Sequence, residues 1–212
     1  QPRLAQQPPG RGSEARAPVP TREAGARLRR RPAVRAVGPG FGGQVLEDDP
    51  QGRATVRSFL TRIKERVYPV GRLDYNSDGL MLLTNDGDLA NFILAAKNQV
   101  PKTYLLKIKG NLSEATQKKL EKGVFLEGER LNPFVIEPLK TTSSGNSWLK
   151  VTITEGKKHI LRNAFKYSGH PVEKLRRVAI GTLTLGKLPL GEWRELREFE
   201  VAAFKKKYRY PE

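Results

Sequence analysis

The sequence predicts an α+β protein, with a largely antiparallel sheet and helices packed on it. Short apolar segments of strand length are interleaved with segments whose apolar residues recur at helical spacing, and no internal repeat of fixed period accompanies them. Hydrophobic residues make up 37% of the 212-residue chain and aromatic residues 8%, which is too many for a wholly disordered chain. The length allows one domain or two small ones.

The first predicted strand is the apolar run at residues 79–84, which is closed by the turn Asn85-Asp86-Gly87. A helix is expected at residues 88–97, with Asp86 or Asp88 favourably placed at its positive end. The remaining elements of this half are, in order, a strand at 103–109, a helix capped by Ser113 and ending near Lys122, and short strands within 124–139 broken by Gly128 and Pro133.

Residues 148–154 alternate between polar and apolar side chains, as a half-buried strand does. The next helix is expected at residues 157–167, and Gly169 stands where a left-handed cap belongs. The inward-facing residues of this helix are expected to be Ile160, Leu161, Ala164 and Phe165. The last elements are strands near 177–185 and 192–197 and an amphipathic helix at about 199–208.

Residues 1–43 differ sharply in composition from the rest of the chain. They hold nine Arg, no Lys and two Glu, a net charge of +7, together with seven Pro, seven Gly and seven Ala. Such a stretch buries too little apolar surface to offset the entropy of ordering it, so we expect a disordered leader at 1–43 and a folded domain at 44–212. The arginines between Arg27 and Arg35 fit an RNA-binding arm, an organelle-targeting remnant or a solvated tail.

The charge balance of the whole chain points to a polyanionic partner. The 39 Lys and Arg against 22 Asp and Glu give a net charge of +17, and nucleic acid is the commonest polyanion that such a field attracts. Disulfides and thiolate chemistry are excluded because there is no Cys, and with only His159 and His170 a multi-histidine metal site is not expected. No apolar run has the length of a membrane span, so we expect a cytoplasmic protein.

A polar loop at residues 71–80 precedes the apolar run and carries the densest chemistry of the chain. Its Asp74 and Asp78 could be turn and cap residues, or catalytic groups held by a rigid sheet. Two carboxylates also allow a glycosidase, whose acid and nucleophile flank the scissile bond, although no sugar-stacking aromatic cluster accompanies the loop.

Four segments of the chain resemble one known family. Residues 70–90 contain Gly-Arg-Leu-Asp, Gly-Leu-Met-Leu-Leu-Thr-Asn-Asp-Gly and Asp-Leu-Ala, and Val-Pro-Lys-Thr-Tyr follows at 100–104, Glu-Gly-Lys-Lys-His at 155–159 and Gly-His-Pro-Val through Val-Ala-Ile-Gly at 169–181. In this order they strongly resemble the rRNA pseudouridine synthases of the RsuA/RluB branch, from about Asp49 to the C-terminal helix. The resemblance implies the pseudouridine-synthase fold.

The resemblance also implies an activity and the residues that perform it. Members of this family convert uridine in RNA to pseudouridine without a cofactor, detaching the base from C1′ at N1 and rejoining it through C5. Carried over, Asp74 is the catalytic carboxylate, and whether it attacks C1′ or assists proton removal at C2′ stays open. Tyr104 corresponds to the tyrosine that stacks on uracil and takes the C5 proton, and Arg162 to the basic residue that pairs with the carboxylate. Without the resemblance, Tyr104 reads as a core residue.

A base must leave the RNA stack before this chemistry, and contacts to the RNA backbone must offset the cost. The resemblance implies that ribosomal RNA, or a precursor of a ribosomal subunit, is the partner, and we expect a monomeric enzyme. The residues expected to bind RNA are Arg72, Lys102, Lys157, Lys158, Lys166, Arg176 and Arg177. A run of charges is otherwise a solvated face, so their convergence in space is a hypothesis.

The chain departs from the family pattern in two places that bear on function. Ile160, Asn163 and Ala164 stand where the family has Gln, a basic residue and Met. Upstream, neither the S4 RNA-binding domain nor the leading strand of the synthase is recognisable, and residues 34–37 are the candidate substitute for that strand. These departures motivate the alternative function, a catalytically impaired RNA-binding module of the same fold.

Overall fold

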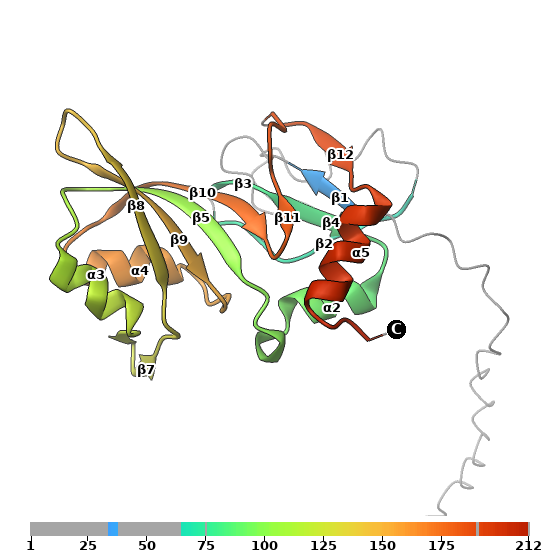
Figure 1. Ribbon diagram of the computed structural model, residues 1–212, viewed down its shortest axis with the longest axis horizontal. Coiled ribbons are helices and arrows are strands. Elements are labelled where there is room, and N and C mark those ends of the chain that lie inside the picture. The colour runs from blue at the N-terminus through green and yellow to red at the C-terminus, as the bar shows by residue number, and fades with distance from the viewer. Residues whose placement is uncertain (1–33, 38–64, 75, 190, 212) are drawn as a thin grey trace, which may run out of the picture. The chain divides into compact units, whose positions relative to one another are not determined.

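The computed structural model describes residues 34–37, 65–74, 76–189 and 191–211, all within one compact unit formed by Pro32–Glu212 (Figure 1). The rest of the predicted leader lies outside the described residues. Helices and strands alternate in an α+β arrangement, as predicted. No helix in the described part of the chain is long and apolar enough to cross a membrane.

The larger sheet has six strands in the order β11-β10-β5-β9-β8, and β3 pairs with β10 outside this path. Its strands are β3 (Asp78–Gly79), β5 (Lys102–Ile108), β8 (Val135–Thr141), β9 (Ser147–Ile153), β10 (Val172–Ile180) and β11 (Leu183–Thr184). Every pairing is antiparallel except that of β3 with β10. The polarity alternation predicted for β9 is confirmed, since Leu149, Val151 and Ile153 are buried and their neighbours are not.

The smaller sheet has the order β12-β1-β4-β2. It consists of β1 (Val34–Val37), β2 (Tyr68–Pro69), β4 (Met81–Thr84) and β12 (Trp193–Glu195). β1 pairs antiparallel with both β4 and β12, so it is an interior strand of this sheet. The prediction of a disordered leader is therefore wrong for these four residues, because their backbone completes the ladders of two strands. Residues 34–37 are the substitute strand that we considered.

The described part of the chain contains the α-helices α2 (Gly87–Leu94), α3 (Glu114–Glu121), α4 (Ile160–Tyr167) and α5 (Glu198–Lys207), and a short 3₁₀ helix, η1 (Ala96–Asn98), follows α2. The predicted caps are confirmed: Asp86 accepts a hydrogen bond from the Leu89 amide at 2.9 Å, and Ser113 accepts one from Thr116 at 3.2 Å. α4 begins three residues later than predicted, because His159 before it has a left-handed backbone with φ +54°.

Two hydrophobic cores organise the unit. The first joins the larger sheet to α3 and α4, and the inward residues predicted for α4 are buried in it. The second joins β4 to α2 and α5, with Leu89, Ile93 and Phe204 fully buried. Each fully buried side chain of this size stabilises the fold by about 1.5–3 kcal/mol. Figure 1 shows β5 and β10 running between the two helical groups.

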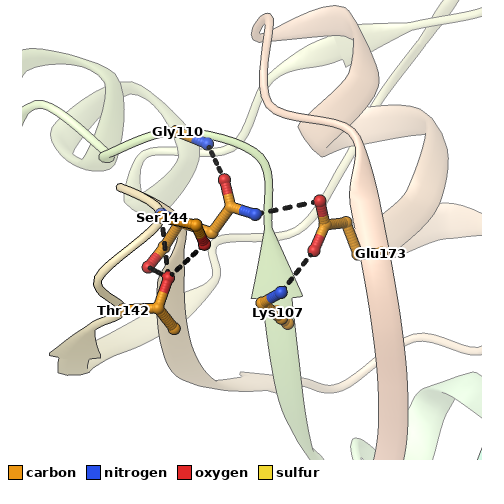
Figure 2. A network of polar contacts seen from close by, with 6 residues as sticks. Lys107, Gly110, Thr142, Ser144 and Glu173 are labelled. Atoms are coloured by element: carbon orange, nitrogen blue, oxygen red, sulfur yellow. Dashed lines mark hydrogen bonds and ion pairs between the residues drawn. The ribbon is translucent and has the colours of Figure 1, made fainter.

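A network of polar contacts closes one end of β5 and β10 (Figure 2). Lys107 forms an ion pair with Glu173 at 2.8 Å, and the Asn146 amide donates to the other Glu173 oxygen at 3.0 Å. The side-chain oxygen Oδ1 of Asn146 accepts a hydrogen bond from the backbone amide of Gly110 at 3.0 Å. The turn between β8 and β9 is thereby fixed to the ends of β5 and β10, and every charge in the network has a partner.

Candidate active site

A cavity of about 260 Å³ lies at the opposite end of β5 and β10. Its walls come from the loop at 70–77, from β5 and β10, and from the loop at 156–161 before and within α4. The predicted site residues that line it are Arg72, Asp74, Lys102, Tyr104, Lys157, Lys158 and Arg177. Arg162, Lys166 and Arg176 do not line it. The volume is close to the lower end of the roughly 300–1,000 Å³ typical of ligand pockets.

Asp74 lies in a loop that begins at Val70, a residue of the second core. Leu73 beside it is buried, and the Ser77 amide donates to the Asp74 carbonyl at 2.9 Å to close a turn. The Asp74 side chain is 28% exposed and points its Oδ1 to within 3.5 Å of His159 Nε2. The carboxylate therefore lies at the wall of the cavity with one charged or polar neighbour on the loop before α4.

Arg162 holds this loop from α4. Its Nη2 donates to the Asn76 carbonyl at 2.5 Å and to Ser77 Oγ at 3.4 Å, and its Nη1 donates to the Val172 carbonyl at 3.2 Å. Burial lowers its pKa, and the Asp74 charge opposes that shift. The direct pairing that we expected is not present: among the described residues the ion pair of Asp74 is with His159. Arg162 acts on Asp74 through its charge and through the loop backbone.

Tyr104 lies on β5, with Val151 of β9 on one side and Arg177 of β10 on the other. It is partly buried, packs against the first core and also lines the cavity. This position agrees with the interpretation of Tyr104 as a core residue and leaves its role in the site a prediction. An aromatic ring at a cavity wall offers a face on which a base can stack.

Arg177 ties the Asp74 loop to the larger sheet. Its Nε donates to the Leu80 carbonyl at 2.8 Å and its Nη1 to the Arg72 carbonyl at 3.3 Å. The backbones meet just as closely: a Cβ on Gly79, which has φ +109°, would lie 2.2 Å from the Arg177 carbonyl oxygen, so only glycine fits there. A register shift in β10 directly after Arg177 sets its direction.

Two of the predicted RNA contacts are interior side chains. Arg177 is 4% exposed and Lys102 is 7% exposed, so neither offers its charged end to a phosphate on the outer surface. Burial, and secondarily the Arg177 charge, lowers the pKa of Lys102. The register of two strands, which the sequence does not reveal, brings these two cations together.

Asp78 does not join Asp74 in the cavity. Both oxygens of its carboxylate accept hydrogen bonds from Arg176, at 2.5 Å and 3.3 Å. This bidentate pair fixes Asp78 at β3. Among the described residues that line the cavity, Asp74 is therefore the one carboxylate. The carboxylate pair that a glycosidase needs is not assembled.

The remaining predicted RNA contacts lie on α4 and the loop before it. Lys157 pairs with Glu129 of β7 (Glu129–Arg130), which together with β6 (Phe125–Leu126) forms a hairpin, and with Glu155 at 3.6 Å. The hydrogen bond that Lys157 donates to Glu129 raises the pKa of Lys157. Lys158 lines the cavity and Lys166 lies in the last turn of α4.

His159 is a site residue that we did not predict. It lines the cavity, contacts Asp74 and holds a left-handed conformation that costs a non-glycine residue on the order of 1–3 kcal/mol. Its place at the end of the Glu-Gly-Lys-Lys-His segment was the available signal. Among the residues that the structure describes, no group of three or more His, Cys, Asp or Glu side chains could hold a metal ion.

The sheet topology and this cavity define the class of protein, an RNA pseudouridine synthase fold. A solved structure titled "Crystal structure of pseudouridylate synthase" superposes with a TM-score of 0.72 at 28% identity, over 81% of this chain and 73% of that one. The chain belongs to the RNA pseudouridylate synthase family, whose model matches residues 42–167. The fold expected from the resemblance is thereby confirmed.

Individual relatives agree with this assignment. An uncharacterized RNA pseudouridine synthase of Aquifex aeolicus is 43% identical over 74% of this chain, and ribosomal large subunit pseudouridine synthase B of Bacillus subtilis is 40% identical over 72%. The matched region is 63% of the length of each. The chain thus spans less than two thirds of the curated relatives it matches.

Proposed function

We propose that the protein converts uridine to pseudouridine in ribosomal RNA, with Asp74 as the catalytic carboxylate. One observation carries the proposal: Asp74 and Tyr104, which lie 30 residues apart in the sequence, line one cavity that is large enough for a base. The family and the relatives named for a ribosomal RNA substrate support it. Such an enzyme would act as a monomer on free ribosomal RNA or a subunit precursor in the cytoplasm.

The reaction is an isomerisation that balances within the nucleotide. The target base leaves the stack, enters the cavity and is held there while its C1′–N1 bond breaks. The base then turns, C1′ bonds to C5, C5 gives up a proton and N1 gains one. Asp74 serves either as the nucleophile at C1′ or as the base at C2′, and its exposed fraction of 28% leaves it accessible to the ribose.

Tyr104 and Arg162 have separate roles in this proposal. Tyr104 stacks on the uracil and accepts the C5 proton, directly or through water. Arg162 positions the Asp74 loop by its hydrogen bonds to the backbone carbonyls of Asn76 and Val172. The RNA backbone is then held by the outer basic residues, which are Arg72, Lys157, Lys158, Lys166 and Arg176.

The test is incubation of the full chain with unmodified transcripts of small-subunit and large-subunit rRNA, followed by pseudouridine mapping. The proposal predicts pseudouridine at defined positions with wild-type protein and none with Asp74→Ala. Activity that persists in Asp74→Ala would refute the role of Asp74. A wild-type chain that binds RNA in a strongly salt-dependent manner but modifies no transcript would instead establish the RNA-binding module.

A further inference from the structure

The inner wall of the cavity holds two buried cations for which the described residues supply no carboxylate partner. Lys102 and Arg177 both line the cavity and are both more than nine-tenths buried. A buried charge ordinarily requires an opposite charge and a full set of hydrogen bonds. Neither residue forms an ion pair with a carboxylate in the described part of the chain, although both lie in that part.

A donor count shows how much hydrogen-bonding capacity is unused. Lys102 Nζ has three N–H donors, and its hydrogen bond is a long one of 3.4 Å to the Val100 carbonyl. Arg177 uses Nε and Nη1 on the carbonyls of Leu80 and Arg72, while its Nη2 is buried with no hydrogen-bond partner among the described residues. Because Arg177 Nη2 has almost no accessible surface, the spare donors at the wall are those of Lys102 Nζ, which an anion or carbonyl oxygens would satisfy.

The Lys102 amine lies at the cavity wall beside the loop before α4. A Cβ placed on Gly156, in the loop before α4, would lie 3.9 Å from Lys102 Nζ, so the amine lies beside that loop. On the other side, the Arg72 carbonyl that Arg177 holds is two residues from Asp74. The pKa of Lys102 is lowered by burial and by Arg177, which agrees with a cation held without a compensating charge.

The proposed reaction generates a matching anion in this cavity. When the C1′–N1 bond breaks, its electron pair stays with the uracil, whose negative charge spreads over N1 and the carbonyl oxygens O2 and O4. The cavity of about 260 Å³ is large enough to hold one base.

We infer that Lys102 is a further catalytic residue, which donates hydrogen bonds to the uracil and stabilises the negative charge that it carries while detached from C1′, with the charge of Arg177 adding to the positive field of the wall. This inference rests on the proposed function. Groups aimed in advance at a developing negative charge in a site closed to water commonly contribute about 10²–10³-fold in rate each. Lys102 is the better residue to test, because Arg177 also ties the Asp74 loop to β10.

The test compares Lys102→Met with Lys102→Arg, which keeps the cation, and with Lys107→Met, a matched change on the same strand outside the cavity. On a transcript that the wild type modifies, we expect kcat to fall about 10²–10³-fold in Lys102→Met, with RNA affinity and its salt dependence unchanged. Lys102→Arg should retain more of the rate than Lys102→Met, and Lys107→Met should match the wild type.

A second substrate separates charge stabilisation from positioning. In RNA with 5-fluorouridine at the target position, the fluorine itself stabilises the detached anion. The measured quantity is the rate at which the original nucleoside disappears. The ratio of this rate in the wild type to that in Lys102→Met should therefore be at least tenfold smaller than with uridine. An equal defect on both substrates, or a weakened affinity with a shallower salt dependence, would overturn the inference while leaving the proposed function intact. A wild type inactive on every transcript would overturn both.

Discussion

The two ends of the β5–β10 strand pair carry lysines in opposite electrostatic situations. At one end, Lys107 is paired with Glu173, which Asn146 also contacts (Figure 2). At the other, Lys102 is buried beside Arg177 with no carboxylate partner among the described residues. A compensated network contributes to the fold, whereas uncompensated buried charge costs stability and persists where function uses it. The comparison therefore separates the part of the sheet that holds the fold from the part that performs the chemistry.

The largest expected effect is at the carboxylate of the cavity. Asp74→Asn removes the reacting group and keeps the size of the side chain, so we expect pseudouridine formation to fall by at least about 10³-fold. The melting temperature should stay close to that of the wild type, because the contact with His159 is partly exposed and 3.5 Å long. Single-turnover assays and thermal melts of the two proteins check both statements, and a substantial residual rate would contradict the first.

Arg162→Met tests whether the loop must be held from α4. The substitution leaves the carbonyls of Asn76 and Val172 without their donor, and a displacement of the loop by about 1 Å would cost about 10²-fold in rate. We also expect a loss of about 1–3 kcal/mol in the free energy of unfolding, from denaturant titration. Arg162→Lys should recover part of the rate. Full activity in Arg162→Met would show that the loop keeps its place without the guanidinium.

Tyr104→Phe separates stacking from proton transfer. The ring and its packing against the first core remain, so RNA affinity and stability should be close to those of the wild type. Removal of the hydroxyl should slow the step in which C5 loses its proton by roughly 10–10²-fold, the lower part of the range for general base catalysis. A larger deuterium isotope effect with 5-deuterated uridine in the variant would support this assignment, and an unchanged rate would remove Tyr104 from proton transfer.

The smallest expected effect is at the compensated end. The hydrogen bond from Lys107 lowers the pKa of Glu173 in the folded protein below its ordinary value of 4.5. A carboxylate with a lowered folded-state pKa stabilises the fold at pH values above its ordinary pKa, and the contribution is lost as the pH falls through the folded value. Glu173→Gln should therefore lower the melting temperature slightly at pH 7 and less at pH 3, with unchanged activity at pH 7. An equal effect at both pH values would contradict the ion pair.

The fold was largely predictable because local patterns determine most of its elements. The alternation at β9 and the caps Asp86 and Ser113 depend on residues adjacent in the sequence, and the structure has them as predicted. The sequence offered β1 only as a candidate strand, because its stability depends on pairing with β4 and β12, which lie far along the chain. The start of α4 was missed because the left-handed backbone of His159 is imposed by its surroundings.

The sequence predicted the place of some site residues but not the surroundings of others. The resemblance pointed to Asp74 and Tyr104, and the structure brings them to one cavity. It did not reveal that Lys102 and Arg177 are buried, because a lysine in a basic sequence looks like any other until strand register places it. The contact between His159 and Asp74 likewise joins two segments that the sequence separates by 85 positions.

The most direct test of the account is one paired measurement on Lys102→Met and Lys107→Met, with the melting temperature and the rate of pseudouridine formation determined for each. Removal of an uncompensated buried cation should leave the melting temperature of Lys102→Met equal to or above that of the wild type while the rate collapses. Loss of the Glu173 pair should give Lys107→Met a slightly lower melting temperature and a normal rate. If both variants lose rate only in proportion to lost stability, the two ends of the sheet do not differ in function and the account is wrong.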